Sequence, residues 1–250
     1  RRIRVTADQS FSSNPKAPSS AALMYSGGVD ANYSLVAHRL KLLGHRTRSV
    51  DAAVLVHGFD IPLADEAWFL TAKQHAAMLL EEFDCPLMQV KTNWRSICAD
   101  WEMQFGFGVA TVLHQLDHDF GCGLWSADLP YNHELIPWGN NSISNPLLSG
   151  ENFHIRSVGA GTDRVEKLRL ISQYPAIREH LRVCWRKPSN GLNCGTCEKC
   201  VRTRLTLMAF GYDATSAFEG SLTPDTVLKV GLSSRAQREL LDDVLRISDS

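Results

Sequence analysis

A glycine-containing segment with the sequence SGGVD, residues 26–30, has the residue types of a phosphate-binding turn. It follows an apolar run, residues 21–25, that is typical of a buried strand, and it precedes a stretch with helical spacing, residues 32–43. The backbone N–H groups of such a turn and the positive end of the following helix dipole attract an anion. Two adjacent glycines let phosphate oxygens approach the backbone without meeting a Cβ atom. The predicted anion-binding residues are Ser26, Gly27, Gly28, Val29 and Asp30.

Four cysteines in the last third of the chain have the spacing of a metal-binding knuckle. They are Cys184, Cys194, Cys197 and Cys200, and the last three form the pattern C-x2-C-x2-C. Short spacings let one turn present several thiolates to a single tetrahedral ion, and a more distant fourth cysteine closes the shell. Four thiolates leave no open coordination position, so the zinc ion that this pattern predicts is structural.

Two other uses of these cysteines stay open. Disulfide bonds are disfavoured because the seven cysteines are odd in number and the chain carries no sign of secretion. An iron–sulfur cluster of the ferredoxin type is disfavoured because Arg204 occupies the place of its fourth cysteine and no proline follows. The remaining cysteines, Cys85, Cys98 and Cys122, are expected to be small core residues.

Apolar runs and helical patterns alternate along the first half of the chain. Further strands are predicted at residues 50–57, 86–90 and 121–126, and helices at 64–83 and 107–116. Strands separated by helices favour right-handed crossovers and a parallel sheet, so the predicted fold class is α/β. Ligands of such sheets bind beyond the carboxyl ends of the strands, and we therefore expect the turns after these strands to converge on one crevice.

A polar stretch with several aromatic residues, 125–146, follows one of these strands and is interpreted as a substrate-binding loop. The predicted substrate-binding residues are Asp128, Tyr131, Asn132, His133 and Glu134. The alternative is a surface coil that Asx turns hold together, since asparagine is frequent in this stretch.

Composition is that of an ordinary globular protein, with 44% hydrophobic and 21% charged residues. The formal net charge of −1 creates no strong field that would attract nucleic acid. No apolar run reaches membrane-spanning length and no signal-peptide pattern is visible, so we expect a cytoplasmic protein without a membrane partner.

The expected organisation is an exposed lead-in over 1–20, a nucleotide-binding domain over 21–175, and a zinc-knuckle and helical tail over 176–250.

The turn at 26–31, SGGVDA, resembles the SGGxDS signature of the PP-loop ATP pyrophosphatases, with Ala31 where serine is usual. Together with the pattern C-x9-C-x2-C-x2-C near the C-terminus, it is similar to the family of 7-cyano-7-deazaguanine synthases. The resemblance implies a Rossmann-like parallel sheet of the PP-loop (HUP) type with a small helical zinc-knuckle region. It also implies cleavage of ATP between the α- and β-phosphates.

The resemblance assigns further roles to individual residues. PP-loop enzymes often carry a phosphate-contacting lysine in the first turn of a helix, and Lys167 matches that position after Thr162-Asp163. The alternative for Lys167 is a solvated surface lysine. Asp30 is expected to act with Mg²⁺, and the two predicted catalytic residues are thus Asp30 and Lys167. His57 and Gly58 are expected at the adenine and ribose.

These assignments favour an enzyme that uses ATP to adenylate a carboxylate or carbonyl oxygen of a small molecule, with ammonia or another amine as the nucleophile. The expected cofactors are ATP, Mg²⁺ and Zn²⁺, and a homodimer is possible. One alternative is thiolation of a nucleobase or tRNA with a sulfur donor, because a basic group of residues near the cysteines could touch phosphate. This group is Arg182, Arg186, Lys187, Lys199, Arg202 and Arg204. The other alternative is a non-catalytic nucleotide-binding protein, because of Ala31.

Overall fold

A computed structural model describes residues 20–189, 191–213, 216–232 and 235–248 of the chain. The predicted lead-in lies outside the described residues except for Ser20. Five strands form one parallel sheet in the order β3-β2-β1-β4-β5, which confirms the predicted α/β class. The strands are β1 (Ser20–Met24), β2 (Ser49–His57), β3 (Leu87–Lys91), β4 (Cys122–Ser126) and β5 (His154–Val158).

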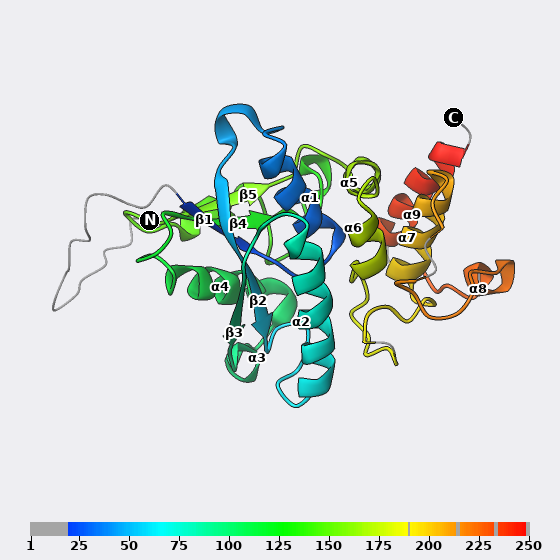
Figure 1. The fold of residues 1–250 in the computed structure, drawn as a ribbon, viewed down its shortest axis with the longest axis horizontal. Coiled ribbons are helices and arrows are strands. Elements are labelled where there is room, and N and C mark those ends of the chain that lie inside the picture. Colours follow the sequence, from blue (N-terminus) through cyan, green and yellow to red (C-terminus); the bar gives the residue numbers. More distant parts are fainter. Residues whose placement is uncertain (1–19, 190, 214–215, 233–234, 249–250) are drawn as a thin grey trace.

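Helices cover both faces of this sheet, as Figure 1 shows. Helices α1 and α2 connect β1 to β2 and β2 to β3 and lie on one face, whereas α4 connects β3 to β4 and lies on the other. The longer helices are α1 (Val29–Arg39), α2 (Glu66–Glu81), α4 (Trp101–His114), α5 (Arg164–Ile171), α7 (Glu198–Ala209) and α9 (Arg235–Ser248). The shorter helices are α3 (Trp94–Ile97), α6 (Pro175–His180) and α8 (Pro224–Leu228), with 3₁₀ turns η1 (Gly44–Arg46), η2 (Tyr131–His133) and η3 (Asn145–Leu148).

The central strand β1 has a neighbouring strand on each edge, and it is buried on both faces because helices pack against both sides of the sheet. Leu23 pairs with Ala53 of β2 on one side and with Leu124 of β4 on the other. The sequences of strands buried on both faces are continuous apolar runs, without the alternation of apolar and polar residues seen in half-exposed strands. This is why the sequence located β1, β2 and β4 to within a residue or two at each end.

Edge strand β5 was not predicted from the sequence. Its five residues, HIRSV, alternate between buried and exposed over the first three positions. The connection from β4 to β5, residues 127–153, is described throughout and contains only two 3₁₀ turns in place of a helix. The expectation that a helix separates each pair of strands therefore failed at this edge of the sheet.

The direction of chain winding reverses between β1 and β4. From β1 the chain proceeds outward to β2 and β3, and on the other side β4 is followed outward by β5. The carboxyl ends of two neighbouring strands diverge at such a reversal and leave a crevice, which is the usual ligand site of open parallel sheets. Residues 25–28 and 127–128 follow β1 and β4 at this point.

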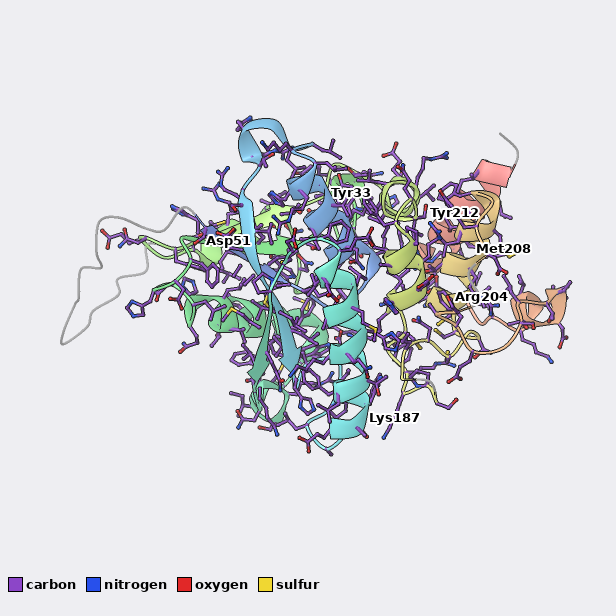
Figure 2. All side chains as sticks on the ribbon, viewed as in Figure 1. Tyr33, Asp51, Lys187, Arg204, Met208 and Tyr212 are labelled. Carbon is purple, nitrogen blue, oxygen red and sulfur yellow. The ribbon has the colours of Figure 1, made fainter. Side chains whose placement is uncertain are left out.

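The C-terminal region packs beside α5 and α6 rather than on the sheet itself (Figures 1 and 2). Arg169 of α5 stacks over the Phe210 ring at 4.5 Å, and Arg178 of α6 stacks over the Tyr212 ring at 4.5 Å. Lys187 forms an ion pair with Asp65 at the start of α2. Among the helices of the described residues, none has both the length and the apolar character needed to cross a lipid bilayer.

One buried histidine makes the stability of this fold depend on pH. His38 of α1 is 3% exposed, and its Nδ1 accepts a hydrogen bond of 2.9 Å from the backbone N–H of Arg48. Burial, with the nearby Arg48 charge adding to it, lowers the pKa of His38 to about 4. The unfolded chain binds this proton below about pH 6.5, so the stability present above that pH is lost as the pH falls toward the folded pKa.

We expect the free energy of unfolding to drop by about 2 kcal/mol from this group between about pH 7.5 and about pH 5. In His38→Asn the amide oxygen can still accept the Arg48 N–H but does not titrate, so this part of the pH dependence should disappear. Urea unfolding at the two pH values measures the difference. An equal loss of stability in both proteins would show that His38 titrates normally. His118→Gln, at a fully exposed histidine, is the control.

Candidate functional site

The turn after β1 is held in shape by a buried asparagine. Asn32 Nδ2 donates hydrogen bonds of 3.0 Å to the carbonyl oxygens of Gly27 and Gly28. The hydroxyl of Tyr25 donates to Asn32 Oδ1 at 2.6 Å. Gly27 has a φ of +75°, a left-handed conformation that glycine adopts without strain. Asn32 is not among the residues predicted from the sequence, although it lies only two residues after Asp30.

Helix α1 begins directly after this turn. Gly28 is the N-cap residue, and no side chain of the described residues caps the helix. The N–H groups of the first turn of an α-helix have no partner within the helix. The Gly28 N–H donates to the Ser26 hydroxyl oxygen, Oγ, at 3.3 Å. The turn can therefore offer several N–H donors to an anion, and its role in phosphate binding stays a prediction.

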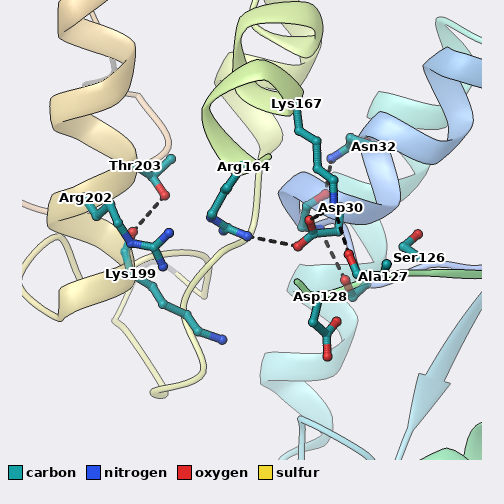
Figure 3. Close-up of polar contacts among 12 residues, drawn as sticks. Asp30, Asn32, Ser126, Ala127, Asp128, Arg164, Lys167, Lys199, Arg202 and Thr203 are labelled. Carbon is teal, nitrogen blue, oxygen red and sulfur yellow. Dashed lines mark hydrogen bonds and ion pairs between the residues drawn. The ribbon is translucent and has the colours of Figure 1, made fainter. Parts of the chain in front are cut away.

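Two cations from α5 meet the carboxylate of Asp30 (Figure 3). Lys167 Nζ lies 2.8 Å from Asp30 Oδ1, and Arg164 Nη1 lies 2.9 Å from Asp30 Oδ2. Lys167 also donates to the carbonyl oxygen of Ala127, just after β4, at 2.9 Å. Lys167 is 1% exposed, so the solvated alternative for this lysine is wrong. The two predicted catalytic residues are in direct contact with each other.

The charges in this crevice shift the acidity of two carboxyl groups in opposite directions. Burial alone would raise the pKa of Asp30, but the Lys167 and Arg164 cations overcome it and hold that pKa below its ordinary value. Asp128 is exposed, yet the protein surrounding its carboxyl raises its pKa, and the Asp30 charge adds to the increase. Trp138 Nε1 donates to Asp128 Oδ2 at 2.8 Å and partly offsets the increase.

Two more cations enter the crevice from α7, on the opposite wall (Figure 3). Arg202 donates from Nε to Glu198 Oε1 at 2.6 Å. Burial and the Arg164 charge lower the pKa of Arg202 to about 10. The charge of Lys199 lowers the pKa of both Asp30 and Asp128. Residues from α1, α5 and α7 thus form one charged cluster that no single stretch of sequence displays.

His57 and Gly58 have structural contacts of their own. The His57 ring is buried, stacks on Phe69 at 4.2 Å, and shares a hydrogen bond of 2.9 Å with the carbonyl oxygen of Pro62. A Cβ atom on Gly58, whose φ is +110°, would lie 1.9 Å from the carbonyl oxygen of Thr92. The protein's own backbone therefore explains the glycine without a nucleotide. Their predicted place beside adenine and ribose stays a prediction.

The predicted substrate-binding residues lie in three different environments. Asp128 lies in the crevice, within electrostatic range of Asp30. Glu134 is buried and organises its own loop, since its Oε1 accepts from Ser142 Oγ at 2.6 Å and both carboxylate oxygens accept from the Ser142 N–H. Tyr131 and Asn132 are exposed in η2, and His133 is half-buried.

The four predicted metal-binding cysteines converge on one point. Their sulfur atoms all lie within 4.8 Å of one another. Sulfur–sulfur distances are 3.5 Å for Cys184–Cys194, 3.8 Å for Cys184–Cys197, 3.3 Å for Cys197–Cys200 and 3.9 Å for Cys194–Cys200. A tetrahedral zinc ion with bonds of about 2.3 Å to sulfur has ligand–ligand edges of about 3.8 Å. The cluster therefore has the dimensions to bind a metal ion such as zinc.

The crowded thiols affect one another's acidity. Hydrogen bonds with Cys197 and Cys200 lower the pKa of Cys184, and hydrogen bonds with Cys184 and Cys197 raise the pKa of Cys200. Four crowded sulfurs cannot all carry negative charge unless a cation lies between them. A bound metal ion would supply that cation, and the four sulfurs would leave it no open position for substrate.

A buried asparagine and an arginine connect the cysteine cluster to the glycine turn. Asn193 Oδ1 accepts from the backbone N–H of Cys184 at 3.0 Å, and its Nδ2 donates to the carbonyl oxygen of Leu181 at 2.6 Å. Arg182 lies between Leu181 and Cys184 in the chain, and its backbone N–H donates to the carbonyl oxygen of Gly27 at 2.9 Å. Arg182 Nε donates to the carbonyl oxygen of Ser26 at 3.1 Å. One short segment thus contacts both sites.

Comparison of the chain with protein-family models, with curated proteins and with solved structures found no match. Function must therefore be inferred from the residues of this chain. The parallel α/β sheet and the C-terminal four-cysteine cluster are features of the structure itself.

The Asp30–Lys167 ion pair should be visible as a coupling energy. We expect Lys167→Met to lower the free energy of unfolding by about 1.5–3 kcal/mol, because the Asp30 carboxylate loses one of its two contacting cations and keeps Arg164. Lys167→Met combined with Asp30→Asn should cost less than the sum of the single changes. Chemical denaturation of the three variants measures this. Strict additivity would contradict the pairing, and Lys229→Met, at an exposed lysine directly after α8, is the control.

We expect purified protein to contain about one metal ion such as zinc per chain, since the four sulfurs surround a single position. Cys184→Ser should lose the metal and unfold more easily, because metal-binding free energy is also folding free energy. Cys98→Ser, at a cysteine outside the cluster, should keep both metal and stability. Elemental analysis decides the matter. Iron with visible absorbance would favour an iron–sulfur cluster, and protein that folds without metal would contradict a metal role.

Proposed function

We propose that this chain is an ATP-dependent adenylating enzyme that binds nucleotide phosphates at the turn of residues 26–30 in the manner of the PP-loop enzymes. One observation carries the proposal. Three cations, Arg164, Lys167 and Lys199, act on the carboxylate of the turn's own Asp30, at the winding reversal of a parallel sheet. A single carboxylate does not need so many cations, whereas a polyphosphate does.

The chain's own residues suggest how phosphates would be held. The N–H groups at the start of α1 would contact phosphate oxygens, and Asn32 would keep the turn in its binding shape. Asp30 would act as the internal counter-ion that keeps Lys167 and Arg164 in place before the nucleotide arrives. Both Asp30 oxygens are engaged by these cations, so Asp30 does not fit a direct ligand of Mg²⁺.

In the proposed reaction an oxygen of the substrate attacks the α-phosphorus of ATP in line. A bond forms between this oxygen and phosphorus, and the bond from phosphorus to the bridging oxygen breaks. The electron pair leaves with pyrophosphate, where Arg164 and Lys167 would stabilise the added charge. Ammonia or another amine then attacks the carbon that carries the adenylated oxygen. The bond from this carbon to that oxygen breaks, AMP departs with the oxygen, and the amine loses a proton to solvent. The cysteine cluster takes no part in the chemistry because four sulfurs close its coordination shell.

Ala31 bears on the non-catalytic alternative. Its methyl group is buried in the core beneath the turn, at 4% exposure, in the cluster that includes Leu23 and Leu35. The missing serine hydroxyl therefore removes one polar contact and leaves the N–H donors and the cations unchanged. The arrangement of charges favours a working site over a degenerate one.

The products of ATP cleavage test the proposal directly. We expect AMP and pyrophosphate when the protein, ATP, ammonia and a library of small carboxylates are combined. Arg164→Gln should reduce the rate by roughly 10²-fold, because it removes a cation from the departing pyrophosphate. Arg46→Gln, at an exposed arginine in η1, should leave the rate unchanged. ADP and phosphate as the only products would contradict the proposal, and a product made only with sulfide would favour thiolation.

A further inference from the structure

Lys199 lies between two of the four clustered cysteines, in the sequence Cys197-Glu-Lys-Cys200. It belongs to the first turn of α7, and its side chain extends from that helix toward the side on which Asp30 and Asp128 lie (Figure 3). Within the described residues, no hydrogen bond or ion pair engages its ammonium group. Asp30 and Asp128 nevertheless lie within range of its charge. An exposed cation held beside two carboxylates without bonding either has room for a further anion.

The cysteine cluster holds the backbone on both sides of Lys199. Cys197 is the N-cap residue of α7 and Cys200 lies in the first turn, with their sulfurs 3.3 Å apart. The carbonyl oxygen of Lys199 accepts a further hydrogen bond from the Thr203 hydroxyl, Oγ1, at 2.7 Å. A metal ion bound to both sulfurs would therefore fix the place from which Lys199 extends.

The same cluster also reaches the opposite wall of the crevice. Cys184 lies two residues after Arg182, whose N–H and Nε bond the carbonyl oxygens of Gly27 and Ser26. One metal ion would thus hold together the segment that supports the turn and the helix that carries Lys199. Loss of the metal ion would let the segment around Arg182 and the start of α7 move apart.

We infer that Lys199 contacts the phosphate groups of the bound polyphosphate and that the metal at the four cysteines sets this contact, so that metal occupancy and phosphate affinity are coupled. The inference rests on the proposed function, because it assigns the outer half of the same phosphate site. The turn and α5 would hold the anion from one side, and α7 would close on it from the other. By linkage, phosphate binding must then retain the metal as strongly as the metal promotes phosphate binding.

The first test measures affinity for inorganic pyrophosphate, and separately for ATP, by calorimetry on metal-loaded protein. We expect Lys199→Gln to weaken binding roughly tenfold, because it removes one charge-assisted contact. Its metal content and melting temperature should stay those of the parent protein. Lys229→Gln, at an exposed lysine directly after α8, should bind as the parent does.

The outcomes separate the inference from the proposed function. Binding by the parent protein with equal affinity in Lys199→Gln would overturn the inference and leave the proposed function standing. No binding of pyrophosphate or ATP by the parent protein would overturn both. A Lys199→Gln protein that has lost its metal or its fold would show a structural role for Lys199 and would also overturn the inference.

The second test follows the release of zinc to a coloured chelator, with no reaction turnover involved. Pyrophosphate should slow the release several-fold in the parent protein and much less in Lys199→Gln. Pyrophosphate itself binds zinc, so the two proteins are compared at the same pyrophosphate concentration. Equal protection of both proteins would contradict the coupling through Lys199.

Discussion

A buried ammonium group organises the crevice end of this protein. Lys167 is 1% exposed, and a charge removed from water costs several kcal/mol unless a partner compensates it. Its partners are the Asp30 carboxylate at 2.8 Å and the Ala127 carbonyl oxygen at 2.9 Å. Three segments must therefore meet at one point, namely the start of α1, the end of β4 and the first turn of α5. The sheet places the first two side by side, and the ion pair brings α5 to them.

The crevice is strongly charged although the chain as a whole is nearly neutral, with a net charge of −1. The carboxylates of Asp30 and Asp128 lie among cations from α5 and α7, and their pKa values move in opposite directions because only Asp30 has cations in direct contact. Such concentrations of opposed charges are found where a protein handles a charged ligand. Overall charge therefore says little here about what the chain binds.

The cysteine cluster and the glycine turn are neighbours because of a short stretch of backbone. Arg182 bonds the turn, Cys184 joins the cluster, and Asn193 fixes the residues around them from a completely buried position. A structural metal centre is usually considered for its effect on folding alone. In this arrangement the four sulfurs also lie beside the segment that contacts the glycine turn and at the start of α7, so contacts that fold this region are shared with the candidate binding site.

The sequence by itself determined the local features of this protein. The strand, glycine turn and helix around residues 26–30 follow from apolar runs and spacing over a few residues, and three of the four cysteines lie close enough in sequence to share a metal. Edge strand β5 was not predicted because the apolar pattern of a short, half-exposed strand is weak. Only the tertiary structure decided that Lys167 is buried against Asp30, that Lys199 faces the same crevice and that Gly58 is packed against Thr92. Those contacts join residues far apart in the chain, and the winding of the sheet, rather than any local pattern, brings them together.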